Sequence, residues 1–531
     1  MERARMQATD DQPGYWVLIE TGSNQEFILQ STRRRFQVGA SGLVKDLERW
    51  VDEAIAAVNG DLTPVVKTSS KALLRVTDRD TGRKVVEKVT TKALRAAPGL
   101  DIWGYVDDES TEPGDAQERL PLVHARHAAL RWSRPSPQQR FPQRPFLDTC
   151  PITATPPSVV IPDPTTAKAK DKKERESRRR IPASALTDKA YDRAYRAIQD
   201  LQKRFGGAIQ RNLDEELTNG GWVAVVHADG NSLGNLITSL ASPEELAGFS
   251  RALTAVTEAA FGEAVESLAR ENWIVPLIIG GDDVTFVCDG RHALAVTRAY
   301  LAAFERHAAA TEAIAGPAQR ETGRRHLTAC AGIAFVKPHF PFHAAHELAE
   351  QLCRSAKTAT KANAEGRSSY DFHVVHDSVV RPLSVIRAGL RRPPGPAGAG
   401  SATLDLWSGP FLAPSGVAAA NTGWAAEHED QILIDDVDLV LEAEVDRTLS
   451  GSAMHQLRQA LMQPHDEVLR RTIERVAASS ADAGVTDFLG RNLPSGRVAQ
   501  GGCSRFMAVL DAADMRSGVL AGPRRVEGGN Q

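Results

Sequence analysis

Two short apolar runs joined by a four-residue turn constrain the fold of this chain more than any other feature. Residues 274–288 read IVPLIIGGDDVTFVC. The runs Ile274–Ile279 and Val284–Cys288 are too short for ordinary helices and are rich in β-branched residues, which predicts strands. Gly280 and Gly281 predict a tight turn between them, because glycine adopts positive φ at little steric cost. We therefore expect a hairpin with two aspartates at its tip.

The two carboxylates at this tip, Asp282 and Asp283, indicate a bound cation. Adjacent like charges repel each other, and nothing nearby in the sequence neutralises them. Hard divalent ions such as Mg²⁺ take oxygen ligands and would remove the repulsion. The GGDD pattern taken alone is also compatible with an ordinary turn.

A second apolar run supplies a third carboxylate. Residues 221–236 read GWVAVVHADGNSLGNL, in which Val223–Val226 is a predicted buried strand and Asp229 follows just past its end. Carboxylates from two neighbouring strands commonly hold two metal ions for phosphoryl or nucleotidyl transfer. The glycine-rich turn after Asp229 opens a predicted helix and would offer backbone N–H groups to phosphates. DGN is also common in ordinary turns, but its pairing with GGDD favours a catalytic site.

The predicted site therefore has metal ligands and phosphate-binding groups. Lys357 and Lys361 lie four residues apart on a predicted helix, so they share a face that would suit a triphosphate; two solvated lysines are the alternative. The expected ligands of two Mg²⁺ or Mn²⁺ ions are Asp229, Asp282, Asp283 and the Gly230 carbonyl. The expected nucleotide-binding residues are Gly230, Asn231, Ser232, Gly234, Gly280, Gly281, Lys357 and Lys361.

Composition excludes several other classes of protein. The 531 residues carry a net charge of −3, so no overall basicity points to nucleic acid. The five cysteines are scattered without a CxxC pair, which argues against a disulfide framework or a zinc ribbon. No run of about 18 apolar residues is present, so we expect a cytoplasmic protein with no membrane partner.

Hydrophobic periodicity predicts an α+β chain with two ferredoxin-like domains and an α-helical C-terminal domain. The order of elements in the two domains resembles that of the palm domains of nucleotide cyclases and polymerases. In the first palm we expect a strand at 15–20, a long helix near 42–58, a hairpin of 71–76 with 84–89, and a strand at 100–106. The expected divisions are a disordered N-terminus (1–13), a degenerate first palm (14–130), a Pro-rich and basic linker (131–183), a catalytic second palm (184–380), a Gly/Pro-rich connector (381–425), an α-helical domain (426–518) and a disordered tail (519–531).

The second palm is expected to contain a helix from the Ser242 cap to about Arg270, a helix near 291–308 and then a polar loop. A core strand at 326–336, a helix at 343–364 and an edge strand at 370–375 would complete it.

Three further features have weaker readings. Glu20 in the first palm is a candidate relic of a metal position, although a structural role is preferred. The basic strip 167–180 is either a solvated linker or a contact for nucleic acid or another acidic partner. The histidines at 339, 343 and 346 lack carboxylate support, so we expect no metal there.

With these motifs in place, the chain resembles the polymerase/cyclase (GGDD palm) large subunit of type III CRISPR effector complexes. IETGSNQEFI and RRRFQVGAS resemble the first palm of that family, and HADGNSLG with GGDD resembles the two acidic motifs of the second. LTACAGIAFVKPHFPFHAAHELAEQLCRSAK and SSYDFHVV resemble the remainder of the second palm. GGDEF diguanylate cyclases share this palm, but Val284-Thr285 replaces their EF pair.

The resemblance implies a nucleotidyltransferase that converts ATP, or another NTP, into a cyclic oligoadenylate or related cyclic oligonucleotide, a second messenger in antiviral defence. RNA or CRISPR-type effector subunits are its implied activators. The family's HD nuclease motif and its zinc-ribbon cysteines, apart from Cys150, are missing here. A stand-alone relative lacking the HD nuclease domain therefore remains an alternative.

Two other functions stay open from the sequence. A catalytically silent palm would bind nucleotide or RNA as a scaffold or sensor in a defence complex. A template-using polymerase would need a duplex-binding groove, for which the strip 167–180 is the one candidate.

Overall fold

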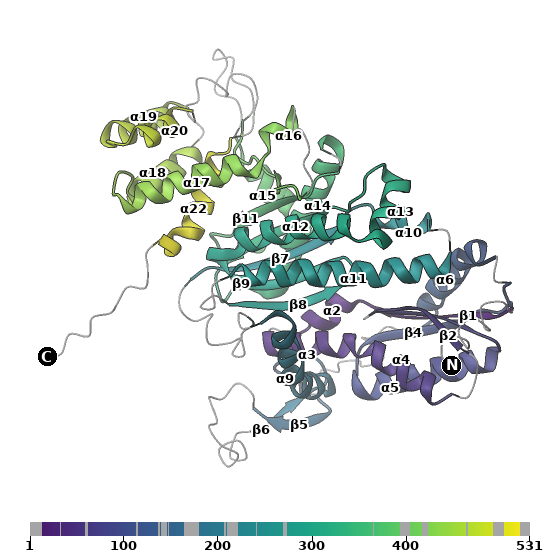
Figure 1. Cartoon of the computed structure of the whole chain (residues 1–531). Coiled ribbons are helices and arrows are strands. Elements are labelled where there is room, and N and C mark those ends of the chain that lie inside the picture. The colour runs from purple at the N-terminus through teal and green to yellow at the C-terminus, as the bar shows by residue number, and fades with distance from the viewer. Residues whose placement is uncertain are drawn as a thin grey trace.

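The computed structural model contains three parts along the chain, shown in Figure 1. The first unit and the C-terminal helices lie at opposite ends of a larger central unit. The structure describes residues 13–31, 33–58, 62–68, 70–112, 115–135, 139, 146, 148–163, 180–206, 209, 221–240, 242–268, 273–364, 366–392, 404–416, 423–463, 466–491 and 504–520.

The first unit is a four-stranded antiparallel sheet with the strand order β2-β3-β1-β4, which is the ferredoxin-like order. Helices α3, α4 and α5 cover one face of this sheet, and α6 lies against the other. Its elements are β1 (Tyr15–Gly22), α2 (Asn24–Leu29), α3 (Arg34–Lys45), α4 (Leu47–Ala56), β2 (Leu62–Lys67), β3 (Lys71–Val76), α5 (Arg79–Ala96), β4 (Asp101–Val106) and α6 (Ala116–Trp132).

The predicted ferredoxin-like order is confirmed, but the prediction of a strand at 84–89 is wrong. This segment belongs to helix α5, and β3 pairs instead with β2. Asp78 begins the helix by accepting a hydrogen bond from Thr81 N at 2.8 Å. Val85 and Val89 lie one helical turn apart and are both fully buried, so the segment buries a helical stripe rather than alternate residues.

The long helix expected near 42–58 is also two helices, because the chain bends at Asp46 between α3 and α4. Arg193 fixes this bend from a neighbouring helix by bonding both oxygens of Asp46, at 3.1 and 3.2 Å.

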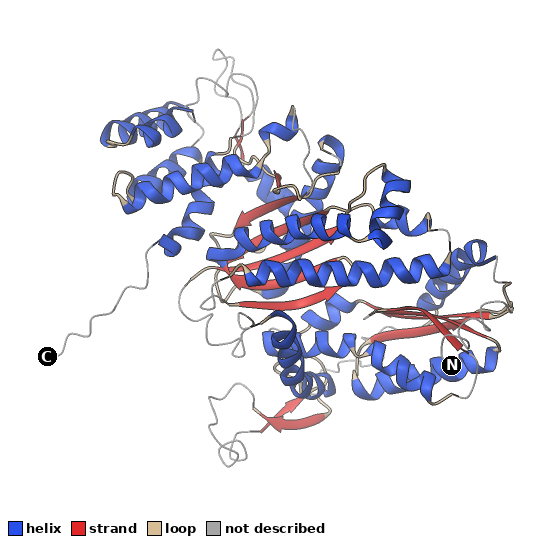
Figure 2. Ribbon diagram, in the orientation of Figure 1, coloured by secondary structure: helices blue, strands red, loops and turns tan. Residues whose placement is uncertain are grey.

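The central unit is a six-stranded sheet with the strand order β14-β11-β10-β7-β9-β8. Figure 2 shows helices stacked over this sheet. Its principal elements are α9 (Ala185–Phe205), β7 (Val223–Gly230), α10 (Leu233–Thr238), α11 (Pro243–Glu266), β8 (Ile274–Gly280), β9 (Asp283–Asp289), η3 (Gly290–His292), α12 (Ala293–Ala310), α13 (Glu312–Thr322), β10 (Ala329–Val336), α14 (Phe342–Asn363) and β11 (Ser369–Val374).

Strand β7 lies inside this sheet and is buried on both faces. Ala224 and Val226 pack with α11 and α12 in one core, whereas Val223 and Val225 pack with α14 in another. This alternation follows from the two-residue period of a strand. The continuous apolar run that predicted a buried strand is therefore explained by helices on both faces.

Several boundaries in the central unit differ from those expected. Strand β7 continues to Gly230, so Asp229 lies within the strand rather than past its end. Helix α11 begins after the predicted Ser242 cap, which accepts from Glu245 N at 3.2 Å, but it ends at Glu266. The expected polar loop after residue 308 contains helix α13. Strand β11 is not at the edge, because β14 (Phe411–Leu412) pairs with it.

The linker prediction needs one correction within 148–163 and 180–183. Strands β5 (Val159–Pro162) and β6 (Arg180–Ala183) form an isolated antiparallel ribbon inside the segment 131–183, which we predicted as a Pro-rich and basic linker. Each strand of this two-stranded ribbon is an edge strand. Proline, which has no backbone N–H to donate, is tolerated at such an edge, and Pro162 and Pro182 lie in these strands. The basic strip is outside the described residues except for Arg180, and so are residues 1–12 and 521–531 of the predicted disordered ends.

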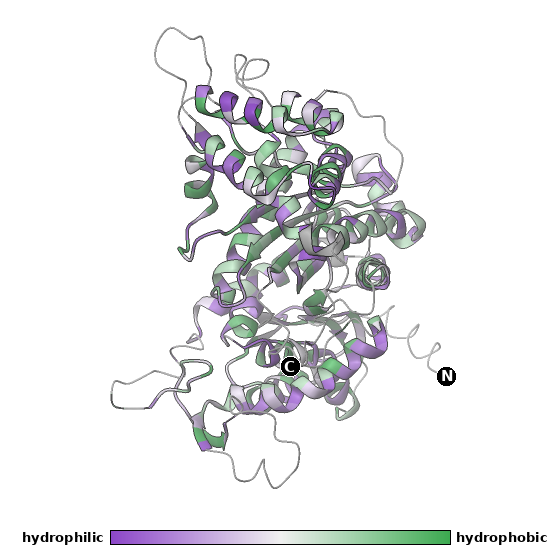
Figure 3. Cartoon of the chain, turned by 90° about the vertical axis from the view of Figure 1, so that its left-hand side faces the viewer, coloured by the Kyte–Doolittle hydropathy of each residue, from purple (hydrophilic) through white to green (hydrophobic). Residues whose placement is uncertain are grey.

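The C-terminal part is helical, as predicted, and its core is continuous with that of the central unit. One buried cluster runs from Ala224 in the sheet to Met515 in the last helix. Figure 3 shows apolar residues concentrated in the strands between the helix layers. The remaining elements are α15 (Leu383–Gly389), β12 (Arg391–Arg392), β13 (Leu404–Asp405), α16 (Trp424–Glu427), α17 (Asp430–Val445), α18 (Gly451–Leu461), α19 (Asp466–Ser479), α20 (Ala483–Arg491) and α22 (Phe506–Leu520).

No helix in the described part of the chain has the length and apolar character needed to cross a membrane.

Candidate metal and nucleotide site

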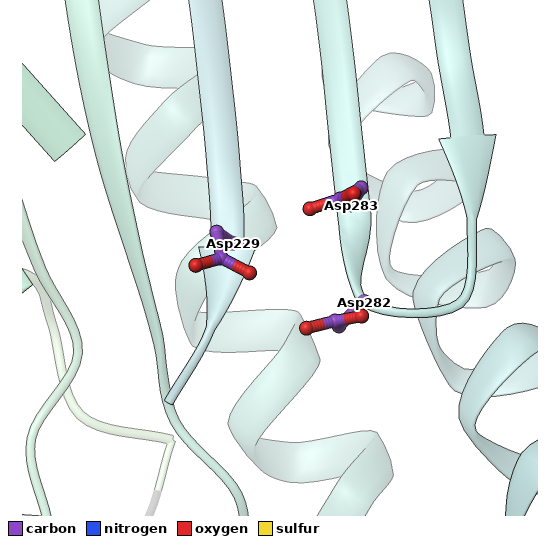
Figure 4. A group of neighbouring side chains, drawn as sticks. All are labelled: Asp229, Asp282 and Asp283. Atoms are coloured by element: carbon purple, nitrogen blue, oxygen red, sulfur yellow. The ribbon is translucent and has the colours of Figure 1, made fainter. Parts of the chain in front are cut away.

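Three aspartates meet where strand β7 ends and strand β9 begins. The two strands are antiparallel and pair as far as Ala228 with Val284, so Asp229 lies across from Asp283. One carboxylate oxygen from each of Asp229, Asp282 and Asp283 lies within 4.8 Å of the others. Figure 4 shows the side chains from the two strands facing one another. The predicted carboxylate cluster is therefore present in the fold.

The hairpin turn that carries Asp282 differs slightly from the prediction. Gly280 pairs with Asp283, which leaves Gly281 and Asp282 as the two central turn residues. Gly281 has φ of 62°, a conformation that favours glycine. Thr257 on α11 donates from Oγ1 to Gly281 O at 2.7 Å and ties the turn to that helix. Gly280 and Gly281 are thus turn residues outside the lining of the site pocket.

Gly230 is required by close packing against the hairpin. A Cβ atom at this position would lie 2.9 Å from Asp282 Cβ and 2.6 Å from Leu233 Cδ1. These separations are too short for ordinary carbon contacts. The glycine therefore lets β7 and the turn come close enough for Asp229 and Asp282 to share one site.

Lys357 reaches this cluster from helix α14. Its Nζ donates to Asp229 Oδ2 and to Gly230 O, both at 2.6 Å. Burial acts to lower the pKa of Lys357, but the hydrogen bond and charge of Asp229 outweigh it, so the pKa is raised. Two oxygens that we predicted as metal ligands therefore accept hydrogen bonds from a lysine ammonium.

The other two carboxyl groups, those of Asp282 and Asp283, have raised pKa values. Burial, together with the charge of Asp229 and a hydrogen bond to it, raises the pKa of Asp282 to about 6. Burial and the charges of Asp282 and Asp229 raise the pKa of Asp283 to about 8. One lysine therefore does not compensate three carboxylates, and this donor set of hard oxygens fits divalent cations.

In the turn after Asp229, Asn231 donates hydrogen bonds to another part of the protein, Thr328. Asn231 N donates to Thr328 O at 2.8 Å, so this N–H is not directed at a ligand, contrary to our expectation. The Asn231 side chain also donates from Nδ2 to Thr328 Oγ1 at 2.8 Å. Ser232 has φ of 61° and begins α10, and with Gly234 it lines the pocket beside the carboxylates.

A pocket of about 460 Å³ opens beside the cluster, and both acidic and basic side chains line it. Its acidic residues are Asp229 and Asp282. The basic residues that line it are Arg324, Lys357, Lys361 and Arg367. Both predicted lysines are therefore brought to the site.

Sequence reasoning missed Arg324 and Arg367. They lie before strands β10 and β11, in the segments GRRH and EGRSS, and neither segment has a periodic or motif signal. Only the pairing of β10 with β7 and β11 brings these segments to the carboxylate end of the sheet.

The other candidate residues have local partners. Glu20 pairs with Lys71 at 3.0 Å and lies 3.4 Å from His127 Nδ1, which agrees with a structural role. His346 is buried against the ring of His227, with centroids 5.6 Å apart, and burial lowers its pKa to about 3.

Comparisons with known proteins define the class of this site. Residues 222–365 match the family model described as the second palm domain of Cas10/Cmr2. This segment contains all three aspartates and both lysines. The domain that contains the carboxylate cluster therefore matches a nucleotidyl cyclase-related palm.

Solved structures resemble the chain over nearly its whole length. The apo Csm1–Csm4 cassette is 13% identical, with 95% of this chain and 70% of that chain covered and a TM-score of 0.52. The same cassette in complex with cA3 is 15% identical, with 95% and 70% covered and a TM-score of 0.51. Its complex with pppApApA is 12% identical, with 95% and 69% covered and a TM-score of 0.50. No curated protein matches the sequence.

At these identities the structures establish the fold, and the family match establishes the second palm. Both findings are similarities to Cas10-type large subunits, so the family resemblance read from the sequence and the predicted fold class are both confirmed.

Proposed function

We propose that this chain is a metal-dependent nucleotidyltransferase that makes a cyclic oligonucleotide second messenger for antiviral defence. The 3′-hydroxyl of one ATP, or another NTP, attacks the α-phosphorus of a second, and pyrophosphate leaves. The observation that carries the proposal is a cluster of three carboxylates, two of which line a pocket that basic side chains also line.

The relatives support the choice of substrate and product. The cassettes of similar fold were solved with pppApApA and with cA3. A linear triphosphorylated oligoadenylate and a cyclic one are the intermediate and product classes of this reaction. We extend them to this chain as part of the proposal, together with an effector subunit or RNA as activator.

The residues divide the work of this reaction between them. Asp229, Asp282, Asp283 and the Gly230 carbonyl are the groups that would hold Mg²⁺ or Mn²⁺. When bound, such ions lower the pKa of the attacking hydroxyl and neutralise the triphosphate. Lys357 holds Asp229 in place through its 2.6 Å hydrogen bond and carries positive charge beside the pocket. Ser232 and Gly234 line the pocket where a phosphate would lie.

The test is to incubate the full chain with each labelled NTP and Mg²⁺ or Mn²⁺, with and without RNA, and to identify products by mass. We expect a cyclic oligonucleotide that disappears in the Asp282→Ala/Asp283→Ala double variant. Asp80→Ala removes an exposed carboxylate on α5 and should change nothing. A product that persists in the double variant would refute the site.

A nucleotide-binding scaffold without turnover is the second candidate. Lys357 already bonds Asp229 and Gly230 O, which is an arrangement that a metal-free binding site would keep. Binding of ATP without any product, with activating RNA present, would favour this candidate.

A further inference from the structure

We propose that Arg324, assisted by Lys361, binds the terminal phosphates of the nucleotide and makes the pocket selective for nucleoside triphosphates over diphosphates. This inference deepens the proposed function, because it presupposes that the pocket takes a nucleotide. It assigns a role to an arginine that carries no sequence motif.

The first observation is that neither cation has a carboxylate partner within the described part of the chain. Neither the Arg324 guanidinium nor the Lys361 ammonium forms an ion pair or a side-chain hydrogen bond among the residues that the structure describes. The neighbouring Arg325 pairs with Glu312 at 2.6 Å, and Arg367 pairs with Glu429 at 2.9 Å. Arg324 and Lys361 are therefore the cations of this region whose charge remains available to a ligand.

The second observation is that Arg324 lies directly against the chain at Gly366. A Cβ atom on Gly366 would lie 2.5 Å from Arg324 Nε and 2.8 Å from Cζ. Gly366 also has φ of 90°, so any other residue would be strained as well as obstructive. Close packing of this kind restricts the guanidinium before a ligand arrives, which reduces the entropy lost on binding.

A third contact holds the same segment in place. His326 Nε2 lies 3.2 Å from Gly366 O, so the segment before β10 is bonded to the one before β11. Both residues line the pocket with Arg324. The part of the pocket lining that contains Arg324 is thus built from two hydrogen-bonded segments rather than from a single loop.

The distribution of charge selects the chemical class of ligand. Asp229 and Asp282 repel phosphate unless a metal intervenes, whereas Arg324 and Lys361 attract it directly. A guanidinium offers a planar fork of donors that matches phosphate oxygens. A ligand that fits both the carboxylates and these cations carries one phosphate that binds through a metal and further phosphates that bind Arg324 and Lys361 directly. A nucleoside triphosphate has these groups.

The experiment measures equilibrium binding of ATP and ADP to the full chain with Ca²⁺, which permits binding without requiring turnover. We expect Arg324→Ala to weaken ATP binding about ten- to hundredfold, the usual effect of losing a charged hydrogen bond. Binding of ADP should change by less than about threefold, since ADP lacks the third phosphate. Lys361→Ala should give a smaller loss in the same direction, because Lys361 is more exposed.

Two variants serve as controls. Arg325→Ala removes the adjacent arginine, which pairs with Glu312 outside the pocket, and should leave both affinities unchanged. Arg324→Lys keeps the charge without the fork and should restore part of the preference for ATP. Thermal denaturation of each variant shows whether it is folded.

The outcomes separate this inference from the proposed function. An unchanged ratio of ATP to ADP affinity in Arg324→Ala, an equal loss for both nucleotides, or no binding of ATP by the wild-type chain would overturn the inference. Selective ATP binding that depends on Arg324, with no product formed under any condition, would leave it standing and refute the proposed transferase.

Discussion

At the scale of single residues, the site is built at an electrostatic cost. Three carboxylates share one cluster. Lys357 donates a hydrogen bond to one of them, Asp229. The raised pKa values of Asp282 and Asp283 express the unfavourable energy of charging the other two. Such arrangements are typical of functional sites, because packing alone does not favour them.

The first prediction is that this cost appears as a pH dependence of stability. Both groups have a pKa near 3.8 in an unfolded chain and about 6 and 8 in the folded one, so the folded state binds protons more tightly. Without metal, they should therefore destabilise the fold progressively as the pH rises from about 4 to about 8. The melting temperature of the Asp282→Asn/Asp283→Asn variant should exceed that of the wild type by a few degrees at pH 8.5 and by less at pH 6.

Divalent metal should reverse this trend. Because protons compete with Mn²⁺ for the same oxygens, its affinity should be about tenfold or more higher at pH 8.5 than at pH 6. Calorimetric titration measures this, and the Asn variant provides the baseline without binding. An affinity that is independent of pH would contradict the carboxylate site.

The second prediction concerns Gly230. Replacing it with alanine would push Asp282 away, so we expect loss of Mn²⁺ binding at a stability cost of about 1–3 kcal/mol. Gly248→Ala on α11 is the control, since a Cβ atom there meets nothing within 4 Å. The control should gain about 0.5–1 kcal/mol, as alanine does over glycine inside a helix. Intact metal binding in Gly230→Ala would show that the close approach is not needed.

At the scale of secondary-structure elements, the hairpin depends on helix α11. Its central turn residue, Gly281, is held by one hydrogen bond from the fully buried Thr257. Helix α11 was predicted from its cap at Ser242, whereas this contact has no sequence signal. The position of the turn is therefore a property of helix and hairpin together.

The third prediction tests this contact. Thr257→Val keeps the side-chain shape but leaves Gly281 O without its donor, which should cost about 1–2 kcal/mol. Because the turn carries Asp282, product formation should fall as well. The control is Thr254→Val, whose hydroxyl bonds only Ser250 O of its own helix. Denaturant unfolding and product assays compare the two, and equal behaviour would exclude a specific role for Thr257.

At the scale of the whole molecule, the C-terminal helices are joined to the second palm. Asp430 at the start of α17 pairs with Arg298 on α12, and its side chain is 2% exposed. Arg367, which lines the pocket beside the carboxylates, pairs with the preceding Glu429. The buried core continues from one part into the other. The domain boundary predicted near residue 425 therefore stays a prediction. The buried core is continuous on the two sides of that boundary.

The fourth prediction is that these two parts unfold together. Asp430→Ala leaves the Arg298 charge without its partner, and breaking a buried pair of this kind costs about 3–5 kcal/mol. Hydrogen exchange should show α17 and the palm strands losing protection together, by a similar amount. Asp435→Ala, at an exposed position on α17, is the control. Loss of protection confined to the C-terminal helices would show that they are an independent domain.

Much of this architecture was predictable because it rests on local patterns. The hairpin with GGDD, the strand before Asp229 and the Ser242 cap each follow from periodicity or from one side chain's preference, and the structure contains all three. The prediction of a strand at 84–89 failed because alternating charge was read as a strand pattern. Val85 and Val89 fit a helix equally well, and their burial by the sheet decided between them.

The sequence by itself determined which groups are present: three carboxylates on or beside apolar strands, glycines at 230 and 281 where close packing and a turn need them, and two lysines on one helix face. These depend on neighbours only a few residues away. The tertiary structure alone decided that Lys357 bonds Asp229, and that Arg324 lies against Gly366 in the lining of the pocket. These contacts join residues far apart in the chain, and they form only once β10 has been inserted between β7 and β11.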